Sequence, residues 1–194
     1  MKITDLDIPD VKLIEPTRHG DPRGFFCETY SKPRFAEAGI DLDFVQDNHS
    51  KSAAAGTLRG LHFQAPPTPQ AKLVRVVRGA ILDVAVDIRQ GSPTFGRHVA
   101  AELSEDNFHQ LLVPVGFAHG FVTLRPDTEV IYKVDGAYAP DCEGGLAWND
   151  PGLAIDWRFD ADDVTLSARD HEWPTLASFD SPFVYEEMPG GRSA

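Results

Sequence analysis

Leu58-Arg59-Gly60-Leu61-His62-Phe63-Gln64 is the stretch of sequence on which the fold and the chemistry of this chain both depend. It sets an arginine, a histidine and an amide among apolar residues and glycine, a composition typical of a β-strand with functional side chains. Arg59 and His62 differ by three positions, so a regular strand would point them to opposite faces. Gly60 permits a bulge or a close backbone approach, which would bring both side chains into one cavity.

A histidine on an apolar strand is, taken alone, more often a buried wall residue than a functional one. Three later segments favour a functional role for His62, because each contributes a group suited to acid-base chemistry. They are the run from Pro114 to His119, the pair Tyr132-Lys133, and Ser167-Ala168-Arg169-Asp170. Together they predict an acid-base site inside a small β-barrel.

The composition limits the class of protein. With 194 residues and a net charge of -12, the chain is long enough for one domain and too acidic for a nucleic-acid or anionic-membrane partner. We expect a single domain over 1–185 and a flexible tail over 186–194. An anionic substrate would need a local basic cluster.

The chain shows no sign of disulfide stapling or of export. Its two cysteines, Cys27 and Cys142, are too few for a disulfide framework. The N-terminus lacks the apolar core of a signal peptide, and no apolar run is long enough to cross a bilayer. These features lead us to expect a cytoplasmic protein.

Short alternating segments separated by proline and glycine predict an antiparallel all-β sandwich or barrel. We expect an edge strand at 11–14 and a short helix that Ser31 caps and that ends near Gly39. In the strand predicted at 44–50, Gln46 and Asn48 share one face.

Three further strands have informative alternation. In 72–78, Lys72 lies on the same face as valines, so it must reach the barrel mouth or a site. In 80–88, alternate apolar residues form a buried face, and we expect Asp83 and Asp87, on the opposite face, to meet solvent. In 129–134, Tyr132 shares a face with valines and is either a core aromatic or a site residue.

Pro114-Val115-Gly116-Phe117-Ala118-His119 has the Pro-x-Gly-x-x-His spacing of the second half of the cupin signature. The chain therefore resembles a cupin, a double-stranded β-helix jelly-roll barrel, here with a few short helices. Cupins usually bind a metal through a His-x-His pair, a glutamate and this last histidine. The corresponding first half reads His62-Phe63-Gln64, and His62 and His119 alone are too few ligands, so we expect no metal.

Nine separated segments resemble the dTDP-4-dehydrorhamnose 3,5-epimerase family, in order along nearly the whole chain. They are Arg23-Gly24-x-Phe26-x-Glu28, Phe44-Val45-Gln46-Asp47-Asn48, Leu58-Arg59-Gly60-Leu61-His62, Lys72-Leu73-Val74-Arg75, Asp83-Val84-Ala85-Val86-Asp87, Ser92-Pro93-Thr94-Phe95-Gly96, Gly116-Phe117-Ala118-His119-Gly120-Phe121, Trp148-Asn149-Asp150-Pro151 and Leu166-Ser167-x-Arg169-Asp170.

The resemblance implies epimerisation at carbons 3 and 5 of dTDP-4-dehydro-6-deoxy-D-glucose, giving dTDP-4-dehydro-L-rhamnose through an enolate. Such a reaction needs a base, an acid on the opposite face of the sugar, and a positive group at the enolate oxygen. By resemblance, His62 is the base, Asp170 orients it and Tyr132 is the acid, while Lys72 serves the oxygen. No cofactor is implied, because the substrate carries its own carbonyl.

The same resemblance implies a substrate-binding set and a homodimer that shares N-terminal strands across its interface. Arg23, Arg59 and Arg169 would bind the diphosphate or its surroundings, and Tyr138 would stack on thymine. The other implied substrate contacts are Glu28, Gln46, Asp47, Asn48, Lys72, His119 and Glu143. Three positions depart from the family pattern: Phe63 replaces a frequent tyrosine, Ala71 a frequent glycine and Arg169 a frequent lysine.

Three other functions remain open from the residues. One is a related epimerase that inverts a single carbon of a dTDP-4-keto-6-deoxyhexose. The others are a metal-dependent cupin and a non-catalytic sugar-binding cupin. The joint presence of His62, Tyr132 and Asp170 favours catalysis over binding alone.

Overall fold

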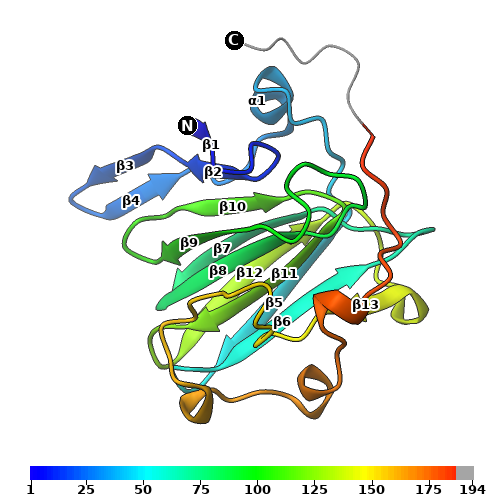
Figure 1. Cartoon of the computed structure of the whole chain (residues 1–194). Helices are drawn as coiled ribbons and strands as arrows, with labels where there is room; N and C mark the ends of the chain where they lie inside the picture. The colour runs from blue at the N-terminus through cyan, green and yellow to red at the C-terminus, as the bar shows by residue number, and fades with distance from the viewer. Residues whose placement is uncertain (187–194) are drawn as a thin grey trace.

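The computed structural model describes residues 1–186 as a sandwich of two antiparallel β-sheets (Figure 1). The larger sheet has the order β1 (Lys2–Asp5), β2 (Lys12–Glu15), β10 (Gln110–Val113), β7 (Lys72–Arg78), β12 (Thr128–Val134) and β5 (Gln46–Ser52). The smaller sheet has the order β13 (Glu143–Gly145), β6 (Leu58–Gln64), β11 (Phe117–Thr123), β8 (Ala80–Asp87) and β9 (His98–Ser104). The all-β jelly-roll prediction is confirmed. Apart from its first residue, the predicted tail 186–194 lies outside the described part of the chain.

Helices are few and short, as predicted. They are α1 (Lys32–Glu37) and the 3-10 turns η1 (Pro140–Cys142), η2 (Ala161–Asp163), η3 (Ala168–His171) and η4 (Leu176–Ser178). The helix α1 follows Ser31 and carries a proline in its first turn, although the Ser31 side chain makes no capping hydrogen bond. Within residues 1–186, no helix is long and apolar enough to span a membrane.

The outer face of each sheet is covered by other parts of the chain. The C-terminal segment, drawn in orange and red, runs along the smaller sheet (Figure 1), and Trp148, Trp157 and Phe183 pack against β6, β8 and β11. Phe35 of α1 packs with Leu73 and other apolar residues on the outer face of the larger sheet. The interior between the sheets is therefore not the only buried region.

The strand predicted as an edge at 11–14 is not an edge. It corresponds to β2, which pairs with β10 on one side and with β1 on the other, where Ile3 lies opposite Ile14. The prediction missed β1 because it is only four residues long, and its burial does not alternate regularly. The N-terminus thus adds one more strand to the larger sheet.

The expectation that Asp83 and Asp87 meet solvent is wrong, because both side chains are completely buried. All eight residues of β8 are buried. The C-terminal segment covers the face with Leu82 and Val84, and the larger sheet covers the face with the two aspartates. A strand that is covered on both faces loses the simple apolar-in, polar-out alternation.

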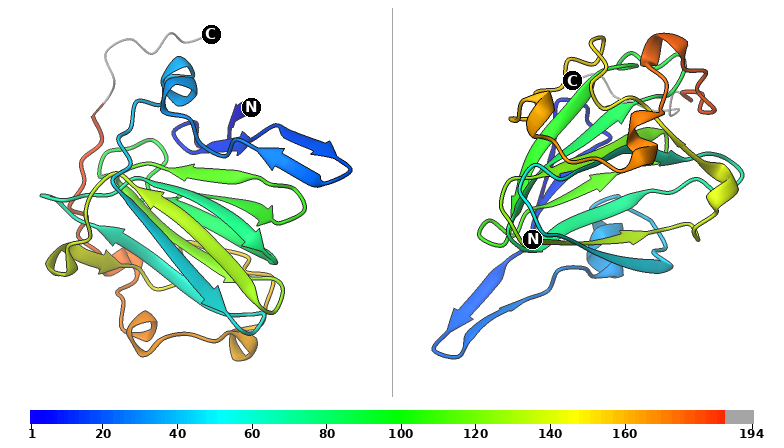
Figure 2. Two further views of the ribbon diagram at one scale, coloured as in Figure 1. Left: turned by 180° about the vertical axis from the view of Figure 1, so that it is seen from behind. Right: turned by 90° about the horizontal axis from the view of Figure 1, so that it is seen from below.

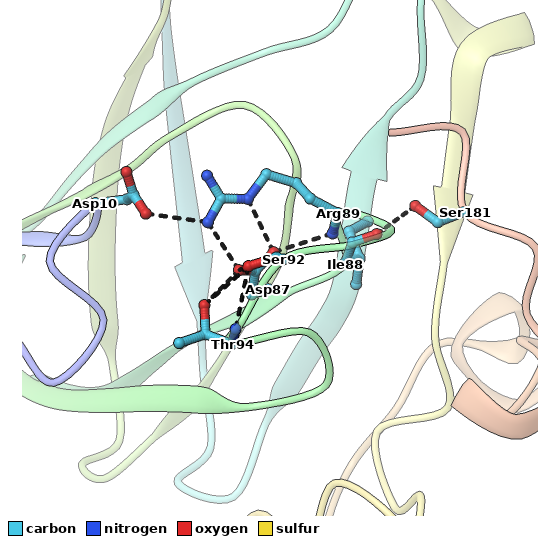
Figure 3. A network of polar contacts seen from close by, with 7 residues as sticks. All are labelled: Asp10, Asp87, Ile88, Arg89, Ser92, Thr94 and Ser181. Carbon is cyan, nitrogen blue, oxygen red and sulfur yellow. Dashed lines mark hydrogen bonds and ion pairs between the residues drawn. The ribbon is translucent and has the colours of Figure 1, made fainter. Parts of the chain in front are cut away.

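Asp87 is the centre of a buried polar network at one end of β8 (Figure 3). Its carboxylate accepts hydrogen bonds from the Arg89 backbone and guanidinium at 2.7–3.0 Å and from the hydroxyls of Ser92 and Thr94, each at 2.6 Å. Burial would raise the pKa of Asp87, but these bonds outweigh it and leave the pKa below its ordinary value. Asp10 contacts the outer side of Arg89 at 3.0 Å.

A hairpin formed by β3 (Arg18–Asp21) and β4 (Gly24–Cys27) projects from the sandwich (Figure 2). Its strands pair only with each other among the described residues. Phe25 and Phe26 are 60% and 70% exposed on it. Two adjacent exposed aromatic side chains on a protruding arm are typical of a surface that another molecule covers.

We expect Asp87→Asn to lower the free energy of unfolding by about 3 kcal/mol, because it leaves the half-buried Arg89 guanidinium without its buried counter-charge. Since the folded pKa of Asp87 is lowered, its contribution exists above the unfolded pKa and is lost as pH falls through the folded value. Urea unfolding at neutral and acidic pH measures both effects. Asp10→Asn, at the exposed side of the same arginine, should cost under about 1 kcal/mol. Equal losses for the two variants would contradict the expectation.

Candidate active site

One cleft opens between the two sheets. Its inner part is a cavity of about 380 Å³ with residues from β5, β6, β7, β11, β12 and the segment 165–170 in its wall. An adjoining cavity of about 320 Å³ shares His62, Lys72 and Tyr132 with it. These three side chains thus lie at the junction of the two cavities, where a bound molecule would meet groups from both sheets.

A bulge in β6 brings Arg59 and His62 into the same cavity. His62 lies opposite His119 on β11, whereas Arg59 lies opposite Phe121, so three steps on β6 match two on β11. Gly60 has a φ of +140°, and a Cβ there would lie 2.5 Å from the Gly120 Cα. Only glycine fits this crossing. The bulge predicted from Gly60 is confirmed.

His62 is hydrogen-bonded to Asp170, 108 positions away, with 2.6 Å between His62 Nε2 and Asp170 Oδ1. The turn η3 places this carboxylate, and the Ser167 hydroxyl donates to its other oxygen at 2.8 Å. Burial would raise the pKa of Asp170, but the bonds from His62 and Ser167 keep it below its usual value. An ionised carboxylate only accepts, so Nε2 carries the proton of this bond, and Nδ1 is the nitrogen that takes another proton when the imidazole acts as a base.

Lys72 points into the cleft from the larger sheet and lies 3.4 Å from the His62 carbonyl oxygen. Burial lowers the pKa of Lys72 to about 8, although Asp83 and Glu143 oppose that shift. Lys72 is therefore still largely a cation at neutral pH. A buried ammonium group of this kind can stabilise negative charge that develops on a nearby oxygen.

His119 and Asp83 form a second histidine-carboxylate pair on the floor of the cleft, 2.7 Å apart. Burial lowers the pKa of His119, against the effect of Asp83, so the imidazole is neutral at pH 7. The second oxygen of Asp83 is buried and has no hydrogen-bond partner among the described residues. The charge of the Asp83 carboxylate is also one of the two that favour the ammonium form of Lys72.

Tyr132 enters the cleft from β12, on the sheet opposite His62. Burial raises the pKa of Tyr132, with Arg59 acting against it, so the phenol keeps its proton at neutral pH. The cleft thus has an imidazole, that of His62, on the smaller sheet and a protonated phenol, that of Tyr132, on the larger sheet.

The outer part of the cleft carries most of the predicted binding residues. Glu143 accepts hydrogen bonds from the Tyr138 hydroxyl at 3.1 Å and from the Arg169 guanidinium at 2.5 Å. Gln46 donates to Asn48 at 2.8 Å, which confirms that the two amides share a face. Arg59, in the wall of the inner cavity, is tied to β5 by hydrogen bonds to Ser52 and Lys51 at 3.4 and 3.3 Å.

Three predicted binding residues lie outside the cleft of their own chain. Asp47 is on the outer face of the larger sheet, where it binds Lys133 at 2.9 Å. Arg23 is at the tip of the projecting hairpin, 89% exposed, and pairs with Asp21. Glu28 follows the hairpin and lies 3.2 Å from Arg34.

The sequence interpretation missed two residues that border this site. The expectation that Asp83 meets solvent overlooks its alternation with Ile81 and Ala85, which places it on the face of β8 that meets the larger sheet. Trp173 lies beside His62, with 6.1 Å between the ring centroids, and no sequence signal marks it. Within the described part of the chain, no three His, Cys, Asp or Glu side chains are grouped as metal ligands.

Comparison with known proteins identifies the chain's relatives. The family model for dTDP-4-dehydrorhamnose 3,5-epimerase matches residues 5–178. A Pseudomonas aeruginosa protein of that name is 50% identical over 93% of this chain and 98% of its own. Two crystal structures are similar. One is the Legionella pneumophila dTDP-6-deoxy-D-glucose-3,5-epimerase in complex with dTDP-4-keto-L-rhamnose, with a TM-score of 0.91 and 43% identity, covering 96% of this chain and 99% of that one. The other is the Bacillus anthracis dTDP-4-dehydrorhamnose 3,5-epimerase with TDP and pyrophosphate bound, with a TM-score of 0.87 and 50% identity, covering 90% and 98%.

We expect the Lys72 ammonium group to titrate near pH 8 in an NMR experiment on lysine-labelled protein. Asp83→Asn should lower this midpoint further, because it removes a negative charge that favours the ammonium form. Asp47→Asn should leave the midpoint unchanged, since Asp47 lies on the outer face of the sheet. A midpoint above about 10, the ordinary range for lysine, would show that Lys72 is not buried in the way described.

Proposed function

The chain belongs to the dTDP-4-dehydrorhamnose 3,5-epimerase family, and we propose that its cleft inverts carbons 3 and 5 of dTDP-4-dehydro-6-deoxy-D-glucose by proton transfer through an enolate. The observation that carries this proposal is the pairing of His62 with Asp170 in the same cleft as Tyr132 and Lys72. A ketone at carbon 4 makes the hydrogens on both neighbouring carbons acidic, so one set of groups can serve two inversions.

His62 acts as the base in this proposal. Its Nδ1 takes a proton from carbon 3 or carbon 5, the electron pair moves into the bond with carbon 4, and the ketone oxygen becomes an enolate oxygen. Asp170 accepts from Nε2–H and stabilises the imidazolium that forms. A positioned base contributes roughly 10²- to 10⁴-fold to the rate.

Lys72 and Tyr132 complete the cycle. The Lys72 ammonium stabilises the enolate oxygen, since it is buried and charged at neutral pH. Tyr132 delivers its hydroxyl proton to the carbon from the face opposite His62, the enolate electrons return to form the new C–H bond, and the configuration is inverted. Solvent then restores the phenol and takes the proton from His62, so each inversion ends without net change to the protein.

The outer cleft is suited to the nucleotide. Arg59 and Arg169 supply the local positive charge that an acidic protein needs for a diphosphate. Tyr138 is 57% exposed at the rim, where its ring can stack on thymine. Gln46, Asn48, Glu143 and His119 add hydrogen-bonding groups along the path between rim and floor. The binding role of Asp47 is still a prediction, and its position on the outer sheet face does not support it.

We further propose that the protein acts as a homodimer in which each projecting hairpin reaches the cleft of the second copy. The hairpin exposes Phe25 and Phe26 and presents Arg23 at its tip. This arrangement would account for the position of Arg23 and Glu28 outside their own cleft, because both would act on the partner's substrate.

The reaction is tested by incubation with dTDP-4-keto-6-deoxyglucose in D₂O, followed by NMR. We expect deuterium at carbons 3 and 5 with the natural protein and none at either carbon with His62→Asn. Tyr132→Phe should retain proton abstraction but slow product formation by roughly 10² or more, since it removes only the acid. Label at a single carbon would indicate a single-carbon epimerase, and unimpaired exchange in His62→Asn would rule out that residue as the base.

The shared site is tested by mixing two inactive or weakened variants, His62→Asn and Arg23→Ala. If Arg23 acts on the partner's cleft, a mixed dimer contains one cleft with both residues intact, and activity should recover towards about half the natural rate per such dimer. Arg125→Ala, another exposed arginine, which pairs with Asp106 and has no predicted role in binding, serves as the control for Arg23→Ala. If the mixed dimer forms but no activity returns, Arg23 does not contribute to the cleft that contains the partner's His62, and the proposal is wrong.

A further inference from the structure

Trp173 touches both the candidate base and a candidate nucleotide-binding cation. Its ring lies edge to face with the His62 imidazole, with centroids 6.1 Å apart and an interplanar angle of 69°. The Arg169 guanidinium carbon lies over the same indole, 5.0 Å from its centroid. The half-buried side chain of Trp173 therefore contacts both His62 and Arg169, which in the proposed function act on different parts of the substrate.

The backbone around Trp173 is arranged to accept this ring. Gly145 on β13 lies directly opposite His62 on β6, and a Cβ at Gly145 would lie 2.6 Å from the indole. The carbonyl of the next residue, Pro174, accepts a hydrogen bond from Ala147 at 2.8 Å. The glycine on β13 thus leaves room for the indole ring, and the hydrogen bond at Pro174 fixes the backbone next to it.

The polar atom of the indole has no evident role in this arrangement. Trp173 Nε1 is buried and has no hydrogen-bond partner among residues 1–186. A buried N–H without a partner costs about 1–3 kcal/mol. The aromatic surface, which contacts His62 and Arg169, is therefore the part of the side chain that explains its presence.

We propose that Trp173 is a positioning residue that transmits nucleotide binding at Arg169 to the orientation of the base His62. The proposal rests on the proposed function, in which His62 is the base. The bond to Asp170 holds only one ring nitrogen, so the imidazole can still turn about that bond. The Trp173 ring, packed against the imidazole, blocks this turn and keeps Nδ1 directed at the cleft.

Arg169 supplies the link to the nucleotide. Its guanidinium is shared between Glu143 at 2.5 Å and the face of Trp173. A diphosphate competes with Glu143 for the same donors, but stacking on an aromatic face leaves the edge of the guanidinium free for phosphate. Phosphate binding therefore holds Arg169 on the indole, and the indole holds His62. Binding energy from a remote part of the substrate is thereby used to orient the reacting group.

The test compares Trp173→Leu and Trp173→Phe. We expect Leu to lower kcat by about 10- to 100-fold with a smaller change in KM, because a misdirected base slows chemistry more than binding. Phe should restore most of kcat, since it keeps an aromatic ring between Arg169 and His62, although that ring is smaller than the indole and lacks the unbonded N–H. In ¹⁵N NMR, dTDP alone should shift the His62 ring resonances in the natural protein and in Phe, but not in Leu.

Phe159→Leu is the matched control, because Phe159 is another half-buried aromatic residue that packs on the core behind the smaller sheet. It should lower stability without changing kcat or the response of His62 to dTDP. A Trp173→Leu protein with natural kcat and a natural His62 response would overturn the proposal, as would a Phe variant no better than Leu.

A measurement on the natural protein guards against a Leu variant that fails to fold. The indole N–H resonance of Trp173, assigned by its absence in the Phe variant, should shift on addition of dTDP. A resonance that does not respond to saturating dTDP would also overturn the proposal. Failure of the proposed function is distinguishable, because it would appear as proton exchange that survives in His62→Asn.

Discussion

The close approach of Gly60 on β6 to Gly120 on β11 is the constraint on which the site depends. With no Cβ on either residue, the two backbones come near enough for β6 to take one more residue than its neighbour between Arg59 and His62. Those side chains would otherwise lie on opposite faces, one in the cleft and one in the core behind the sheet. The same bulge leaves Leu61 and Phe63 in that core. A single irregularity therefore brings a guanidinium and an imidazole to the cleft without removing the apolar face that holds the C-terminal segment. That segment in turn carries Asp170 to His62.

Much of the fold and of the inner site could be predicted from the sequence, because both follow from periodicity and glycine placement. The alternation in β7 and β12 directs Lys72 and Tyr132 inward, and Gly60 signals the bulge. The wrong predictions concern residues whose burial depends on another part of the chain, which the sequence of a single strand does not reveal. Asp83 and Asp87 look like residues of a solvent face until the larger sheet is set against β8, and the carboxylates then prove to be buried partners of His119 and Arg89. Trp173 escaped prediction for a similar reason, since its role depends on the absence of a side chain at Gly145, 28 positions earlier in the chain.

Burial determines the protonation states in the cleft, because it disfavours the charged form of acids and bases alike. Burial lowers the pKa of Lys72 and of His119 and raises the pKa of Tyr132, so each shift favours the neutral form of the group. Asp170 is the exception, because hydrogen bonds from His62 and Ser167 outweigh the same effect. The result is one carboxylate that stays ionised beside an imidazole, one phenol that keeps its proton, and one ammonium that remains positive at neutral pH with little margin. Each of these protonation states is the one that proton transfer through an enolate requires.

Gln64 shows how a barrel of this type can be committed to proton transfer. It occupies the place at which a cupin's His-x-His pair has its second histidine, two positions after His62 on the same face of β6. Its amide nitrogen donates to the carbonyls of Thr68 and Ala137, the latter at 3.0 Å, and its oxygen accepts from the Ala139 backbone at 2.9 Å. All of its partners are main-chain groups, and two of them flank Tyr138. The side chain therefore holds the loop that presents Tyr138 at the rim of the cleft, and its only strong acceptor is already used. A residue that fastens the outer end of the cleft stands where a cupin has a metal ligand, and the groups that remain around His62 are suited to moving protons.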